Sequence, residues 1–192
     1  MLRLEKQNEM CREFEEKYIS PIGYNFNELF TTDWSTGKME AVSFNDLYLS
    51  LYKLDTGAYV SYFNNPYPVV EGSPFSLVPA EEFESLIRKY IDVDADSIKA
   101  ASNYDEGSDA YPVRIDGPHD GLAKIPVPEV IDVTKNDDET YTLLVDALFV
   151  EYATDCAFSH ELIVRPENGG GFKYVSNRLI PSEKNIFPKR NT

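Results

Sequence analysis

Three residues near the C-terminus have side chains suited to nucleophilic catalysis. Ser159 and His160 are adjacent, and Cys156 precedes the histidine by four residues. On a strand, adjacent side chains point to opposite faces, so Ser159 and His160 cannot exchange a proton there. Cys156 and His160 share a face but stand too far apart for direct proton transfer. The sequence also lacks G-x-S-x-G and H-E-x-x-H motifs, so we predict no catalytic residue and favour a protein that is not an enzyme.

The best metal-binding pattern is the run 92–96, which alternates three aspartates with two apolar residues. An EF-hand loop needs glycine at its sixth position and glutamate at its twelfth. Counted from the first aspartate, those positions hold Ser97 and Asn103. Asp94 is more simply the N-cap of a following helix. His119 lies in a loop with acidic neighbours, which is a weak metal signal. We therefore expect no metal site and no cofactor.

Composition and charge set the class of protein. The chain has 192 residues, 42% hydrophobic and 13% aromatic, which is enough for a folded core. Its formal net charge of −15 argues against nucleic acid and anionic membranes as partners, because both repel an acidic surface. No run of 18 apolar residues could span a bilayer. Two cysteines, Cys11 and Cys156, are too few for a disulfide scaffold.

The first part of the chain has helical periodicity and the last part has strand periodicity. Before residue 115 the chain is mainly helical and aromatic-rich, and 116–192 has the alternation of an antiparallel sheet. The segment 58–75 is rich in aromatics and broken by prolines, so we expect a short strand followed by a packed loop. Helices are predicted at 2–19, from Ser43, from Pro79 and at 95–102. Strands are predicted at 127–135, 140–152, 156–166 and 171–180.

This order of elements predicts one α+β domain spanning residues 1–192. We expect the N-terminal helices to pack on a C-terminal four-stranded antiparallel meander, in the manner of cystatin-like or NTF2-like folds. Aromatic side chains in 44–75 could line a pocket for a peptide or a sugar. Aromatics at helical spacing are more often core, and we favour that interpretation.

The last hairpin gives the most specific prediction. A turn at 167–170 places His160 opposite Asn177, and a tight turn at 153–156 places Phe149 on the other side of His160. That face is otherwise apolar, so we expect His160 to be buried or to line a pocket, with Asn177 hydrogen-bonded to its ring.

Two interpretations of this pair stay open, a structural polar pair beneath the helices and a ligand site. On the opposite face, Glu161 is expected to lie diagonal to Arg178 and to form a solvent-side ion pair. The predicted ligand-binding residues are His160, Asn177, Phe149, Tyr174 and Arg178.

Several segments together have a family likeness. These are Phe44 and 47–59, Leu-Val-Pro-Ala-Glu-Glu-Phe-Glu at 77–84, Tyr-Asp at 104–105, Tyr-Pro at 111–112, Phe-Ser-His-Glu-Leu-Ile-Val at 158–164 and Phe-Lys-Tyr-Val-Ser-Asn-Arg at 172–178. The chain resembles an uncharacterised family of extracytoplasmic proteins, often lipoproteins, from clostridial-type Gram-positive bacteria. The resemblance implies an envelope location and a cleaved N-terminal anchor, which would be the only link to a membrane. The N-terminus of this sequence has no signal peptide, so a cytoplasmic location follows if Met1 is the native start.

Three functions are compatible with these patterns. The leading hypothesis is a non-enzymatic extracytoplasmic domain that binds a protein, a peptide or an envelope glycan. The second is a small-ligand carrier or an enzyme with a pocket over the sheet near His160. The third is a cytoplasmic acidic inhibitor of a basic partner, such as an immunity-type protein.

Overall fold

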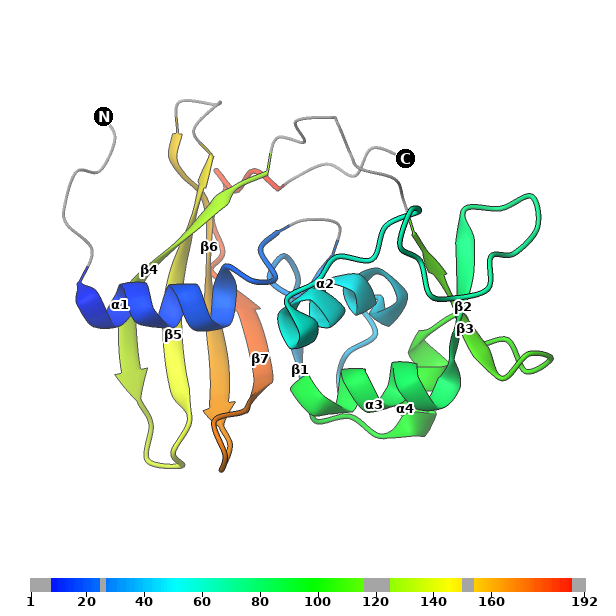
Figure 1. The fold of residues 1–192 in the computed structure, drawn as a ribbon. Helices are drawn as coiled ribbons and strands as arrows, with labels where there is room; N and C mark the ends of the chain where they lie inside the picture. The colour runs from blue at the N-terminus through cyan, green and yellow to red at the C-terminus, as the bar shows by residue number, and fades with distance from the viewer. Residues whose placement is uncertain (1–7, 25–26, 116–124, 150–153, 188–192) are drawn as a thin grey trace.

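The structure, a computed structural model, contains two antiparallel sheets and four α-helices within residues 8–24, 27–115, 125–149 and 154–187, which are the residues it describes. The larger sheet has the strand order β1-β7-β6-β5-β4, and β2 pairs with β3 in the smaller one. Helix α1 lies across one face of the larger sheet, whereas α2, α3 and α4 gather with β2 and β3 beside its β7 edge (Figure 1). The α+β fold class is therefore confirmed, with a helical part beside the sheet as well as on it.

The C-terminal meander has the four predicted strands. A fifth strand, β1, was not predicted and joins the sheet at the β7 edge, where Trp34 lies opposite Asn177. With only two residues, this strand has no sequence alternation by which it could be recognised. The strands of the larger sheet are β1 (Trp34–Ser35), β4 (Val127–Lys135), β5 (Tyr141–Phe149), β6 (Thr154–Pro166) and β7 (Phe172–Leu179).

Helices α2 and α4 begin at residues whose side chains accept a hydrogen bond from a backbone amide in the first helical turn. Ser43 Oγ accepts from the Asp46 amide at 3.3 Å, and Asp94 Oδ1 accepts from the Ser97 amide at 2.8 Å. These bonds confirm the helix start predicted at Ser43 and the N-cap predicted at Asp94. Gly57 ends α2 with φ of 71°, a left-handed conformation that favours glycine. No helix in these described residues is long and apolar enough to cross a membrane. The helices are α1 (Glu9–Phe14), α2 (Phe44–Thr56), α3 (Ala80–Tyr90) and α4 (Ala95–Ala101).

The predicted helix at 2–19 is divided in the structure. From Glu9 it runs as α1 and then continues as a π-helical segment, η1 (Glu15–Ile19), while its predicted start at 2–7 lies outside the described residues. Both segments pack on β4 of the larger sheet. Tyr18 of η1 meets Phe172 of β7 edge-on, with ring centroids 4.8 Å apart. This part of the chain does cover the sheet as predicted.

The remaining helices share an aromatic core with the small sheet. Tyr48 of α2 stacks on Phe83 of α3 with centroids 5.0 Å apart, and Phe83 stacks on Tyr111 of β3 at 4.1 Å. The aromatics at helical spacing are thus core, as expected. The predicted strand early in 58–75 is wrong, because this segment forms no strand before β2 (Phe75–Pro79), which pairs with β3 (Ala110–Arg114). Before β2, Val69 makes an isolated bridge with Ser76. Buried residues of both parts belong to one hydrophobic cluster.

The strand register around His160 differs from the prediction. His160 lies opposite Leu179 of β7, not opposite Asn177. On its other side it faces Val145 of β5, so the expected neighbour Phe149 is also wrong. Phe149 pairs instead with Thr154, before a register shift in the β5–β6 ladder.

Two irregularities explain the β6–β7 difference. The hairpin loop is one residue longer than predicted, so Pro166 pairs with Phe172 rather than with Gly171. A bulge between Ile163 and Val164 then shifts the register by one more residue. A register shift of one residue would place His160 and Asn177 on opposite faces of the sheet, but a shift of two residues returns them to the same face. His160 therefore remains on the buried side and becomes a diagonal neighbour of Asn177.

Candidate functional site

His160 lies at the centre of a fully buried polar network. Its Nδ1 is 2.6 Å from Asn177 Oδ1, and its Nε2 is 2.9 Å from the Tyr24 hydroxyl. Asn177 Nδ2 donates to the Thr32 carbonyl at 2.8 Å, which leaves its Oδ1 to accept from His160. The proton therefore sits on Nδ1, and the Tyr24 hydroxyl donates to Nε2. Both ring nitrogens of His160 are satisfied by the protein itself.

Aromatic rings fill the space around this histidine. Phe30 stacks on the imidazole with centroids 5.6 Å apart, and Tyr24 meets it edge-on at 5.8 Å. Burial lowers the pKa of His160 to about 4, against an opposing contribution from the Asn177 hydrogen bond, so the ring is neutral at pH 7. His160 has an exposed fraction of 0% and does not border the open pocket described below. Its contacts fit the structural interpretation of the His160–Asn177 pair.

Three other predicted ligand residues, Tyr174, Phe149 and Arg178, do not form an open pocket around this histidine. Tyr174 is buried, and its hydroxyl donates to the Tyr18 carbonyl at 2.7 Å. Phe149 is buried further along β5. Arg178 is exposed and forms the predicted ion pair with Glu161, although the two residues are directly opposite rather than diagonal. The structure therefore brings His160 and Asn177 into contact and buries Tyr174 and Phe149 as well, whereas Arg178 lies apart from them on the exposed face.

Ser159 and Cys156 belong to a separate cluster. The Ser159 hydroxyl donates to Asp146 Oδ1 at 2.7 Å, and Cys156 Sγ lies 3.4 Å from Ser159 Oγ. Ser159 and His160 thus have different partners on opposite faces of β6, as predicted. Burial raises the pKa of the Cys156 thiol, with an opposing contribution from the Ser159 hydrogen bond. A raised pKa makes this thiol a weak nucleophile, and neither Cys156 nor Cys11 forms a disulfide.

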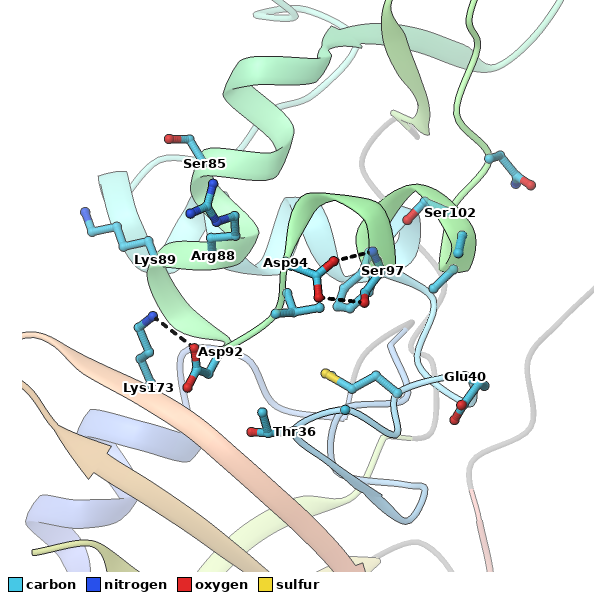
Figure 2. A pocket seen from close by; sticks show the side chains of 17 residues that line it. Thr36, Glu40, Ser85, Arg88, Lys89, Asp92, Asp94, Ser97, Ser102 and Lys173 are labelled. Atoms are coloured by element: carbon cyan, nitrogen blue, oxygen red, sulfur yellow. Dashed lines mark hydrogen bonds and ion pairs between the residues drawn. The ribbon is translucent and has the colours of Figure 1, made fainter.

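An open pocket of about 1110 Å³ lies between α3, α4 and the chain around β1 and β7. Figure 2 shows Arg88 and Lys89 of α3 along its upper wall and Lys173 of β7 below them, beside Asp92. Asp94 and Ser97, at the start of α4, face the middle of the pocket. Among the described residues, no group of three or more histidine, cysteine, aspartate or glutamate side chains is placed to hold a metal ion.

Most charges around this pocket already have partners. Lys89 forms an ion pair with Asp55 of α2. Asp92 lies 3.3 Å from the Arg165 guanidinium and 4.0 Å from Lys173 Nζ. In the run 92–96, Asp92 therefore takes part in ion pairs and Asp94 caps α4.

A second surface feature is the aromatic turn, residues 59–64 between α2 and β2. Tyr59, Tyr62 and Phe63 are 66%, 70% and 85% exposed. The Ser61 amide and hydroxyl both donate to Asn64 Oδ1, at 2.6 and 2.9 Å, and Asn64 Nδ2 donates to the Tyr59 carbonyl at 2.7 Å. These bonds hold the backbone of the turn while its aromatic rings face solvent.

The prediction of a packed loop is wrong for the aromatic turn. The rings of Tyr62 and Phe63 contact each other edge-on, with centroids 6.0 Å apart, rather than the core. Exposed apolar side chains continue along the same connection at Val69, Val70 and Phe75. The sequence did carry a signal for a surface turn, since two asparagines and a proline follow Phe63.

Comparison with known proteins adds the family but no activity. Neither the curated proteins nor the solved structures gave a significant match to the chain. A family model, by contrast, matches residues 1–192. The chain belongs to that family, which is described as a family of unknown function (DUF6070).

Proposed function

We propose that this protein is a non-enzymatic extracytoplasmic binding domain that docks onto another protein through the aromatic turn. The supporting observation is the exposure of Tyr59, Tyr62 and Phe63 on one short, internally hydrogen-bonded turn. Clustered exposed apolar side chains on a soluble domain are typical of interaction surfaces. Tyrosine is also among the residues that contribute most to binding at protein interfaces.

The turn is already organised for binding. Asn64 accepts two hydrogen bonds from Ser61 and donates one to the Tyr59 carbonyl, so little backbone order has to be gained on association. Binding surfaces that are ordered beforehand lose less conformational entropy. The connection that carries the turn runs across the helical part of the molecule from the end of α2 to β2 (Figure 1).

Charge indicates what kind of partner to expect. The net charge of −15 favours a basic protein with an apolar recess and opposes pairing with a second copy of this chain. An acidic inhibitor of a basic partner would use the same surface, and only the compartment would differ. The likeness to extracytoplasmic lipoproteins of clostridial-type Gram-positive bacteria supports the envelope location. Cell fractionation of the native protein tests that location directly.

The docking proposal is tested by photo-crosslinking followed by affinity measurement. A benzophenone amino acid replaces Phe63 in one sample and Val127, an exposed valine of β4, in the control. Proteins captured only from position 63 are purified, and their affinity for the domain is measured by calorimetry. Tyr62→Ala and Phe63→Ala should each weaken binding by about 2 kcal/mol or more, whereas Val127→Ala should not.

Three outcomes would contradict the proposal. The first is equal capture from positions 63 and 127, and the second is an affinity that Tyr62→Ala and Phe63→Ala leave unchanged. The third is binding to envelope glycans, through the same aromatic side chains, without any protein partner.

A further inference from the structure

We propose that the open pocket between α3, α4 and β7 binds a short peptide with free termini, its carboxylate on Arg88 and its amino group on Glu40. This site is separate from the aromatic turn and does not depend on the function proposed for it. The pocket is an open concave feature of about 1110 Å³. Pockets that bind small ligands are concave and carry a few well-placed polar groups.

The argument for a ligand with two charges comes from the charges lining the pocket. Lys89 is paired with Asp55, and Lys173 lies beside Asp92, which also binds Arg165.

Asp94 is also engaged, because its two oxygens accept from the Ser97 amide at 2.8 Å and from the Ser97 hydroxyl at 3.0 Å. Two lining charges are left, Arg88 and Glu40, and neither has a hydrogen bond or an ion pair with any residue of the described chain. They are one cation and one anion.

The two unpaired charges lie on opposite sides of the pocket. In Figure 2, Arg88 projects from α3 beside Asp94, whereas Glu40 lies on the far side, beyond Asp94 and Ser97. A guanidinium binds a carboxylate through two parallel hydrogen bonds, and a carboxylate binds an ammonium group by charge and hydrogen bonding. A zwitterion extended across the pocket would satisfy both.

The size of the pocket indicates a short peptide rather than a single amino acid. The volume of about 1110 Å³ is at the upper end of the range for pockets that hold drug-sized ligands, so the space accommodates a short peptide and is large for a single amino acid. Met39, Val93 and Ala101 line the same space and could contact small side chains.

Titration of the full chain with trialanine and trileucine tests the proposal. Chemical shifts of backbone amides in the isotope-labelled protein report both the place and the affinity of binding. We expect saturable shifts at lining residues such as Ser97 and Asn103. The C-terminal amide of each peptide should bind roughly ten- to a hundredfold more weakly, because it loses the charge-assisted bonds to Arg88. The N-acetylated peptides should bind more weakly for the same reason at Glu40.

Variants of exposed residues provide matched controls. Arg88→Gln and Glu40→Gln should weaken binding of the free peptide and abolish the difference made by amidation or acetylation, respectively. Arg88→Lys keeps the charge without the planar fork and should have an intermediate effect. Arg12→Gln and Glu16→Gln, the same changes on exposed residues of α1 and η1, should have no effect.

The proposal is overturned if neither peptide gives saturable shifts. It is also overturned if the amidated peptide binds as tightly as the free one, or if Arg12→Gln weakens binding as much as Arg88→Gln. The last result would indicate general charge attraction.

Discussion

The buried imidazole of His160 should make the stability of the protein depend on pH in a defined window. The folded-state pKa is about 4, and an exposed histidine in the unfolded chain has a pKa of 6.5. As pH falls below 6.5, the unfolded state binds a proton that the folded state does not. The contribution of the neutral histidine is therefore fully present above pH 6.5 and decreases as pH falls toward 4.

The size of this effect follows from the gap between the two pKa values. Each pH unit of the gap is worth about 1.4 kcal/mol, so the free energy of unfolding should fall by about 3 kcal/mol between pH 6.5 and pH 4. That loss is a large fraction of the 5–15 kcal/mol typical of a folded domain, roughly a fifth or more.

Urea denaturation at a series of pH values measures the effect. Trp34 is the single tryptophan, lies opposite Asn177 and is buried, so its fluorescence reports on this part of the sheet. His119→Gln is introduced into both samples, so that only one histidine can titrate. The variant His160→Gln keeps a polar side chain but does not titrate, and the remaining acidic groups are common to both proteins.

The difference between the two pH profiles isolates His160. The protein with His160 should lose about 3 kcal/mol more stability than the His160→Gln protein between pH 6.5 and pH 4. Parallel profiles over this window would refute the reasoning, because they would mean that His160 takes up a proton equally in both states. A ring pKa near 6.5, measured by NMR in the folded protein, would refute it independently.

Three further predictions concern stability measured by urea denaturation at pH 7. Ser43→Ala removes the N-cap of α2 and should cost about 1 kcal/mol, whereas Ser43→Asp should retain most of the stability; equal losses would contradict the capping role. Phe83→Ala should cost about 3–5 kcal/mol because the ring is fully buried, whereas Phe63→Ala should change stability by less than about 0.5 kcal/mol. Tyr67→Phe should cost about 1–2 kcal/mol by removing the hydroxyl that donates to Glu82 at 2.5 Å, and the loss should shrink in a Glu82→Gln background.

Local sequence signals predicted the elements of this fold well because their causes are local. Ser43 and Asp94 begin helices by accepting amide hydrogens three residues ahead, an interaction that depends on spacing alone. The four strands of the meander were found for a similar reason, since alternation between buried and exposed positions is visible within each strand.

Long-range placement could not be obtained in the same way. The register of β6 and β7 depends on one extra loop residue and one bulge, and neither has a distinct sequence signal near Val164. The His160–Asn177 hydrogen bond was nevertheless predicted. The extra loop residue and the bulge together shift the register by two residues, so the two side chains stay on the same face of the sheet as diagonal neighbours. The predicted hydrogen bond therefore agrees with the structure only because the two shifts compensate. The predicted neighbour of His160 on β5, Phe149, is wrong.

The exposure of the aromatic turn could not be predicted from the sequence for another physical reason. Tyr48 and Tyr62 are the same residue type in one aromatic-rich segment, yet Tyr48 is fully buried and Tyr62 is 70% exposed. The difference lies in what each backbone segment contacts. Helix α2 places Tyr48 against Phe83, whereas the bonds from Asn64 close a turn on itself and leave its rings without a core to cover. An apolar side chain kept out of the core by satisfied backbone bonds gains burial only from another molecule, which is the physical reason for proposing a binding surface there.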